Sequence, residues 1–422
     1  MCKPVNLKIV IAIIIFGSMN INSFAQTTFK WGKQFGSGKE VYVMNHVVDS
    51  KGNIYISGRT TGNIGGENLG QNDGFLMKTD SAGNIVWKKQ FCTTGNENIQ
   101  WSAIDDSDCV CITGSTTGSL AGKNAGKEDI FVIKYSPDGK MLWVKQTGTD
   151  STDVAKGICT DHSGNIYITG MTLGNLGNSS SGKSDGFVIK FDPDGNQLFC
   201  YQFGTPDDDS GSSITCESGK IYLCGTTFGD LACKNKGFID VFTGEITDKG
   251  EPVKFIQSGT EGFDIPMDIK VDKEKNIYVG GNTSGNWGCQ QAGEGDCFLM
   301  KIDDSWKILW VSQFGTKDHD GIRSVALNDK VSDNILVSGL IHLPPANAFI
   351  RMIRKDGTTL WERQIIDEGK SGDASGKSVT IDNDGNIYHV GLTGADLFGP
   401  LSGSHDFYLV KLRLDPTLKI QK

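Results

Sequence analysis

The sequence predicts an all-β fold, a seven-bladed β-propeller in which each blade consists of four antiparallel strands. Two observations support this prediction. A six-residue string that ends in glycine, typified by NIYITG, recurs seven times, and strand-forming runs surround most copies. The copies end at Gly58, Gly114, Gly170, Gly225, Gly281, Gly339 and Gly391, which lie 52 to 58 residues apart. Such regular spacing indicates one repeat architecture.

The third unit illustrates the four runs. Residues 157–161 and 165–169 are joined by a short connection with Gly164, and this pattern is typical of a hairpin because glycine adopts positive φ easily. The third run starts at Asp185 with the pattern Asp-x-Phe, and the fourth ends on an aromatic residue, Phe199. Runs such as IYI and FVIK are apolar on successive residues, so both faces of each sheet should be covered.

The two ends of the chain complement each other. The seventh unit has only its first three runs, whereas a spare fourth run, residues 29–36, precedes the first unit. We therefore expect the strand around Trp31 to complete the last blade and close the ring, which removes two exposed sheet edges.

The repeated pattern WxKQFG…GNIYxTG…DxFxxK resembles the bacterial SBBP repeat, the exported seven-bladed β-propeller repeat, over residues 27–415. The sixth unit departs from it, because Asn347-Ala348-Phe349 replaces the Asp-x-Phe start only eight residues after Gly339. The resemblance implies a fold and export. It implies no functional residues.

Residues 1–25 are typical of an export signal. Lys3 and Lys8 precede or flank an apolar run, residues 9–16, and small residues stand before Gln26. The alternative is an uncleaved N-terminal anchor, against which the small residues before Gln26 argue. The apolar run itself is too short to span a bilayer. We expect residues 26–422 to form one domain that is periplasmic, on the cell surface or secreted.

The amino-acid composition excludes some classes of protein and makes some kinds of binding partner less suitable. Glycine supplies 55 of 422 residues without a Gly-x-y period, and 37% of residues are apolar, which excludes collagen and wholesale disorder. The net charge is −9, and it argues against nucleic acid or an anionic lipid surface as the main partner. We expect a monomer without a transmembrane segment that binds an extracellular glycan or protein.

No catalytic motif stands out. The six histidines fall at non-equivalent repeat positions, so they read as surface or strand residues. The calcium-loop-like strings at 192–196 and 382–386 occupy hairpin-turn positions and have no later bidentate Glu. Most of the ten cysteines of residues 26–422 look like buried strand residues, although Cys233 and Cys289 occupy equivalent loop positions that a disulfide could join.

One set of acids recurs. An acid lies 17 to 19 residues before each anchor glycine, at Glu40, Glu97, Asp153, Asp208, Asp264, Asp320 and Asp373. With alternating strand directions, these acids and the long Gly-rich loops share one face, which we call the loop-rich face. Each acid either caps a turn or contributes to a negative field that attracts a divalent cation such as calcium. No other cofactor is evident.

The loop-rich face also suggests a place for a ligand. The sixth unit has a short loop, residues 340–346 with Pro344-Pro345, which predicts a notch in the rim. Trp287 and Phe398, in the flanking long loops, could offer apolar or sugar-stacking surface.

These features favour a binding or scaffold module that acts through the loop-rich face. The alternative is an extracellular enzyme that acts on glycans. A quinone-dependent propeller enzyme is a weaker alternative, because such enzymes usually have eight blades and an adjacent Cys-Cys pair, and this sequence predicts seven blades and contains no such pair. Repetition favours binding, because an active site needs dissimilar groups that converge once.

Overall fold

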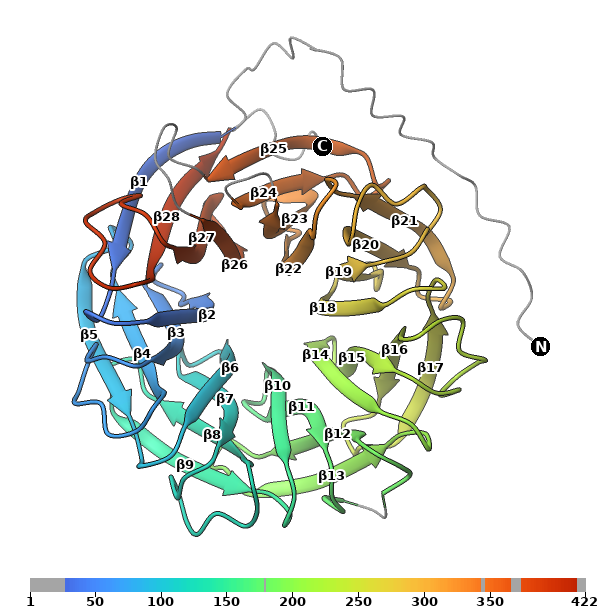
Figure 1. Ribbon diagram of the computed structural model, residues 1–422, viewed down its shortest axis with the longest axis horizontal. Coiled ribbons are helices and arrows are strands. Elements are labelled where there is room, and N and C mark those ends of the chain that lie inside the picture. The colour runs from blue at the N-terminus through green and yellow to red at the C-terminus, as the bar shows by residue number, and fades with distance from the viewer. Residues whose placement is uncertain (1–26, 178–179, 343–345, 366–372, 416–422) are drawn as a thin grey trace.

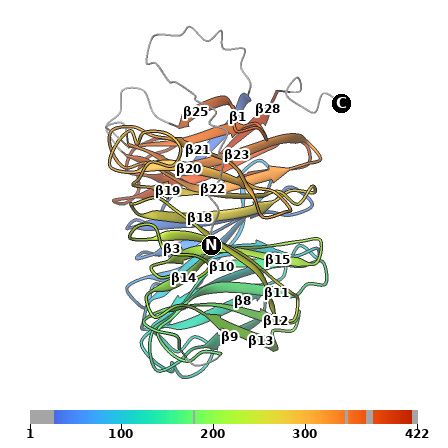
Figure 2. The ribbon, with the colours of Figure 1, turned by 90° about the vertical axis from the view of Figure 1, so that its right-hand side faces the viewer.

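The computed structural model describes residues 27–177, 180–342, 346–365 and 373–415. These residues form 28 strands and no helix, and the strands lie in seven four-stranded antiparallel sheets. The sheets stand around a central axis as the blades of a propeller (Figure 1), and Figure 2 shows the same ring from its edge. The predicted all-β, seven-bladed fold is confirmed.

The first six blades follow the chain in order. Blades one and two consist of β2 (Val41–Val48), β3 (Ile54–Thr60), β4 (Asp73–Thr79), β5 (Ile85–Phe91) and of β6 (Glu97–Ile104), β7 (Val110–Thr116), β8 (Asp129–Tyr135), β9 (Met141–Thr147). Blades three and four consist of β10 (Asp153–Thr160), β11 (Ile166–Thr172), β12 (Asp185–Phe191), β13 (Gln197–Phe203) and of β14 (Asp209–Glu217), β15 (Lys220–Thr227), β16 (Asp240–Ile246), β17 (Pro252–Ser258). Blades five and six consist of β18 (Asp264–Val271), β19 (Ile277–Thr283), β20 (Asp296–Ile302), β21 (Ile308–Phe314) and of β22 (Gly321–Asn328), β23 (Ser332–Ile341), β24 (Asn347–Ile353), β25 (Thr359–Ile365).

Blade seven contains both ends of the described chain. It consists of β26 (Ala374–Ile381), β27 (Asn386–Thr393), β28 (Asp406–Leu414) and β1 (Thr27–Phe35). The pairing of β1 with β28 runs from Thr27 opposite Leu414 to Phe35 opposite Phe407. The predicted closure by the strand around Trp31 is confirmed, and it gives the outer edge of β28 a partner.

Burial differs with the place of a strand in its blade. The first strand is innermost and the fourth is outermost (Figure 1). Third strands such as β8 are buried along their whole length, because neighbouring blades cover both faces. First strands such as β2 alternate buried and partly exposed residues, and most of β5 is exposed or partly exposed.

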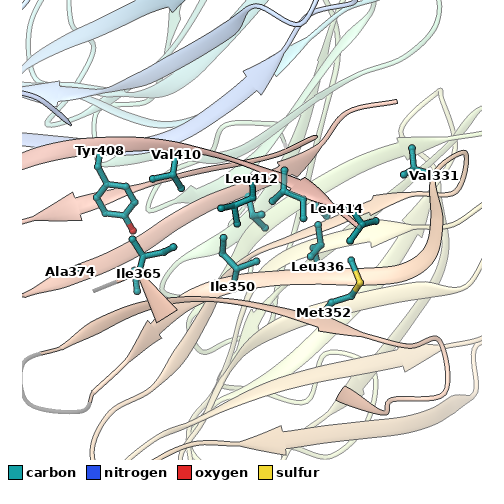
Figure 3. Close-up of a cluster of buried hydrophobic side chains, with 14 residues drawn as sticks. Val331, Leu336, Ile350, Met352, Ile365, Ala374, Tyr408, Val410, Leu412 and Leu414 are labelled. Atoms are coloured by element: carbon teal, nitrogen blue, oxygen red, sulfur yellow. The ribbon is translucent and has the colours of Figure 1, made fainter. Parts of the chain in front are cut away.

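The hydrophobic core lies between neighbouring blades. Figure 3 shows the cluster between blades six and seven, where Ile350 and Met352 of β24 belong to the same cluster as Val410 and Leu412 of β28. Six further clusters of this kind are present among the described residues. Each blade is therefore stabilised mainly by its neighbours, as expected for a repeat protein.

The aromatic residue expected to end the fourth run instead lies near the start of the fourth strand, as Trp87 does in β5, and it contacts a turn of the next blade. The Trp87 indole N–H donates to the carbonyl oxygen of Pro137 at 3.2 Å. Gly139 of the same turn has φ +84°, and a Cβ at this position would lie 3.0 Å from the Trp87 ring. Glycine is required here both by its backbone conformation and by the close contact.

One disulfide is present among the described cysteines. It joins Cys159 of β10 to Cys216 of β14, with 6.2 Å between their Cα atoms, and so connects blades three and four. The pair suggested by loop position, Cys233 and Cys289, is not joined. Their Sγ atoms lie 3.4 and 3.8 Å from the carbonyl oxygens of Gln257 and Gln313, each within its own blade.

The predicted export signal, residues 1–25, lies outside the described residues. Within the part of the chain that the structure describes, no helix is long and apolar enough to span a membrane.

Deletion of residues 27–35 should lower the melting temperature by at least ~10 °C and reduce solubility. The deletion breaks the ladder of β28, each lost hydrogen bond costs about 1 kcal/mol, and an unpaired strand edge promotes aggregation. Thermal unfolding monitored by circular dichroism measures the effect, with residues 26–422 as the reference. An unchanged melting curve would contradict closure by β1.

The double substitution Cys159→Ser, Cys216→Ser should destabilise the protein by up to about 4 kcal/mol, because the bond closes a loop of 57 residues and restricts the unfolded chain. Urea unfolding gives this difference. Cys289→Ser, which changes an exposed free cysteine, is the control and should leave the midpoint unchanged. Equal midpoints for all three proteins would show that the bond does not form in solution.

Candidate functional site

Five acids occupy one equivalent position at the start of the first strand. Each is at most 3% exposed, and in four of the five blades the acid lies opposite a threonine of the second strand. The five are Glu97, Asp153, Asp209, Asp264 and Asp320. Blades one and seven have Val41 and Ala374 at this position instead.

The hydrogen bonds of Asp153 show what these acids do. Its carboxylate accepts the backbone N–H of Thr149 at 2.6 Å and the Thr149 hydroxyl at 2.9 Å. It also accepts the hydroxyl of Thr172 on the second strand. The acid therefore caps the turn into the blade and joins its first two strands. Glu97 repeats these three contacts with Thr93 and Thr116.

Three acids of the predicted set lie one residue before this position. Asp208 accepts the Ser184 hydroxyl at 2.8 Å, and Asp373 accepts the backbone N–H of Ala346 at 2.9 Å. The backbone of Glu40 forms an isolated parallel β-bridge with the backbone of His405. The spacing between acid and anchor glycine varies by up to two residues, so it could not show which of two adjacent residues begins the first strand. Strand pairing shows that Asp209, not the predicted Asp208, is the equivalent of Asp153.

A second repeated pair holds the long loops in place. In blade two the Gln146 amide donates to Asp129 at 2.9 Å and to the Gly118 carbonyl at 3.0 Å. The Gln146 side-chain oxygen accepts the N–H of Leu120, and Asp129 accepts the N–H of Ala125. Equivalent glutamines are Gln34, Gln90, Gln202, Gln257 and Gln313. The long loops are therefore fixed over the outermost strands of their blades, away from the channel.

The two aromatic residues predicted for the rim pack beneath these loops. Trp287 is 9% exposed, and its ring lies 4.9 Å from that of Phe298. Phe398 lies against Phe29 and Tyr408, at 6.0 and 5.9 Å between ring centroids. Neither is displayed as a stacking platform. Pro344-Pro345 of the predicted notch lies outside the described residues.

Carboxylates face each other between blades. A Cβ at Gly259 would lie 2.2 Å from Asp240 Oδ1 and 2.8 Å from Asp264 Oδ2, so the two side chains meet across this glycine. Burial raises the pKa of both acids, and each one's hydrogen bonds partly oppose the shift. Asp240 Oδ1 has no hydrogen-bond partner, and the same holds for the Oδ1 atoms of Asp129, Asp185 and Asp296.

A cavity of about 790 Å³ lies in the central channel. It is lined by the second halves of the first strands and by hairpin turns: residues 45–52, 101–104, 158–160, 214–216, 324–328 and 378–384, among others. These segments place the cavity toward the face of the ring that lies opposite the long loops. We call this face the hairpin face. Sequence reasoning missed the cavity, because the first-strand residues that line it differ from blade to blade, whereas its repeated hairpin turns indicated only turn chemistry.

The cavity wall is polar. Asn45 donates to the carbonyl oxygen of Ser102 at 2.9 Å and accepts the Ser378 hydroxyl at 2.7 Å, which links three adjacent blades. Asp268 accepts the Lys270 ammonium at 2.7 Å and the Val325 N–H at 2.9 Å. Dissimilar polar side chains from several blades thus line one open cavity, as is typical of ligand sites.

The buried histidines serve the packing of blades seven and one. Burial lowers the pKa of His46 and His389 to about 3, so both rings are neutral at physiological pH. Their Nε2 atoms are hydrogen-bonded to the hydroxyls of Thr380 and Ser338. The described residues contain no cluster of three or more His, Cys, Asp or Glu side chains that could hold a metal ion.

The architecture defines a closed repeat protein of the β-propeller class. Three segments, residues 30–66, 142–178 and 360–399, match the SBBP family, which is described as a beta-propeller repeat. The chain is thus a seven-bladed propeller of which three segments match the repeat that its sequence resembles.

Two curated proteins are similar in sequence. Regulatory protein FlaEY of Caulobacter vibrioides is 23% identical over 426 residues, covering 86% of this chain and 43% of that protein. An uncharacterised WD repeat-containing protein of Acanthamoeba polyphaga mimivirus is 31% identical over 114 residues, covering 23% of this chain and 8% of that protein. The chain spans less than half of either relative.

Solved structures share the fold at low sequence identity. Drosophila Plexin A, in complex with Semaphorin 1b, has a TM-score of 0.51 and 8% identity, with 92% of this chain and 88% of that chain covered. Drosophila Semaphorin 1b, extracellular domains 1-2, has a TM-score of 0.50 with the same identity and coverage. These likenesses show the propeller fold alone.

Asp240→Asn should stabilise the protein at pH 7 by ~1 kcal/mol, because an amide N–H can replace the unpartnered Oδ1 and donate to Asp264. Asn347 occupies the equivalent position in blade six, so the amide fits. A raised pKa means that the folded state binds protons more tightly, so stability falls as pH rises from ~4 through the raised pKa. The variant should lose less stability over this range.

Urea unfolding between pH 4 and pH 7 measures both effects. Asp194→Asn, at an exposed turn position, is the matched control and should follow the unmodified protein. A steeper loss of stability in Asp240→Asn than in the control would contradict the assignment of the carboxylate pair.

Proposed function

We propose that this protein is an exported binding module whose ligand site is the channel cavity on the hairpin face. The observation that carries the proposal is the 790 Å³ cavity, where polar side chains that differ between blades meet in the channel. The loop-rich face is less suited than the sequence suggested, because its loops, acids and aromatic residues are engaged within the fold. Export rests on the sequence of residues 1–25.

The similarity to a protein named as regulatory supports a binding role over a catalytic one. Three of the carboxylates that line the cavity, Asp49, Asp268 and Asp382, already accept hydrogen bonds from neighbouring residues of the fold. We propose an extracellular glycan or protein segment as the class of ligand, which would enter from the hairpin face.

Two matched substitutions on opposite faces test the location. Thr215→Trp places a bulky side chain on the cavity wall, whereas Thr152→Trp places the same side chain at the loop-rich rim of the neighbouring blade. Ligands are first found by applying residues 26–422 to a glycan array and a panel of extracellular proteins. We expect Thr215→Trp to weaken binding at least tenfold and Thr152→Trp to leave it unchanged.

The reverse pattern would place the site on the loop-rich face. A hydrolase substrate panel is run in parallel, and turnover of any glycan that Thr215→Trp abolishes would replace the binding module with an enzyme.

A further inference from the structure

All seven innermost strands carry a β-bulge at the same place. The register of each first strand against its second strand skips one residue, and this bulged residue is partly exposed in every blade. The bulged residues are Met44, Gln100, Lys156, Ser212, Met267, Arg323 and Lys377, which we call the bulge ring. Bulges re-aim side chains. Because these strands are innermost, the exposed part of the ring borders the channel.

The bulge ring contains three cations and no acid. Lys156, Arg323 and Lys377 belong to blades three, six and seven. Arg59, on the second strand of blade one, adds a fourth cation close to Lys377. In a protein with 50 acidic and 41 basic residues, such a segregation of positive charge is unexpected from composition.

These cations have no counter-charge within the described chain. None of the four forms an ion pair with a described residue, whereas Lys270 on the hairpin side of the ring pairs with Asp268 at 2.7 Å. Burial, together with repulsion from Arg323 and Arg59, lowers the pKa of Lys377 to about 8. Burial also lowers the pKa of Lys156 and of Arg323, and no carboxylate contributes to either shift.

Several of their donors are unused. Arg59 Nη1 donates to Asn98 at 3.4 Å, and its guanidinium lies 5.1 Å from the centre of the Tyr42 ring. Arg323 Nη1 lies 3.7 Å from the sulfur of Met267. The Nε atoms of both arginines are buried without an acceptor. Unpaired, partly dehydrated cations are costly, and a bound anion would remove this cost.

We propose that the channel binds an oxyanion, a carboxylate, phosphate or sulfate group, between Arg59, Arg323 and Lys377. Guanidinium groups donate to such groups in bidentate fashion, and the ammonium supplies a further charge. The three side chains come from the adjacent blades six, seven and one, so one anion contacts three blades. This site goes beyond the proposed function. It lies between the cavity and the loop-rich face, and an oxyanion can bind to it without a ligand in the cavity.

Thermal unfolding and calorimetric titration of residues 26–422 with sodium phosphate, sulfate or acetate test the proposal, against sodium chloride at equal ionic strength. We expect a saturable rise in melting temperature with at least one of these anions. Lys377→Met and Arg323→Met should each weaken its binding at least tenfold. Lys88→Met, at an exposed position of β5, is the control and should bind as the unmodified protein does.

A second readout separates this role from a structural one. Without added oxyanion, Lys377→Met should melt at a higher temperature than the unmodified protein, because an unpaired cation has been removed. Absence of any saturable response, or equal responses of Lys377→Met and Lys88→Met, would overturn the proposal.

Thr215→Trp distinguishes this site from the cavity. Retention of the oxyanion response in this variant supports a separate site, even if no glycan or protein ligand is found. Comparing the affinity for acetate with the affinity for glucuronate then identifies the source of the anion. Tighter binding of glucuronate that Thr215→Trp removes points to an acidic sugar that extends into the cavity. Equal affinities for the two anions point to a free ion.

Discussion

The constraint on which this structure depends is that seven four-stranded sheets must close into one ring, with the last blade completed by the first described strand. Closure requires the first and last described strands to share a blade, and it requires neighbouring blades to meet at a constant angle. An aromatic residue within the fourth strand meets this second requirement by packing on a turn glycine of the next blade, at Gly83, Gly139, Gly195, Gly250 and Gly357. Where the equivalent turn has Trp306 instead, its backbone still adopts positive φ, at +67°. The turn conformation is thus maintained even without glycine.

Repetition separates the residues that build the ring from those that distinguish one propeller from another. The buried acids and the glutamines of the fourth strands recur because most blades anchor their loops and turns in the same way. The cavity wall and the bulge ring follow the opposite rule. The equivalent positions of the bulge ring hold Met, Gln, Lys, Ser or Arg, and the same backbone bulge is present with each of them. Chemistry that differs between blades is therefore the more informative guide to a ligand in this chain.

Much of the fold could be predicted from the sequence, because the anchor glycines, hairpin turns and apolar runs are local signals that recur seven times. The spare strand around Trp31 even indicated how the ends meet. The site could not be predicted in the same way. Asp208 and Asp209 are both acids, and only strand pairing shows which of them faces a threonine. Lys377 and Arg59 lie far apart in the sequence, and their proximity follows from closure alone. The disulfide similarly joins strands of two blades, whereas the sequence pointed to equivalent loops.

The pairing of Thr27 with Leu414 also has a consequence for how the protein folds. The chain is made from its N-terminus, so among the described strands β1 is synthesised before the others but is the last to find its partner. Six blades can form from contiguous segments while β1 waits, and its slow, long-range pairing with β28 completes the ring. A waiting strand is a risk for aggregation, and β1 carries Lys30 and Lys33, the kind of charge that keeps an unpaired edge from joining another chain.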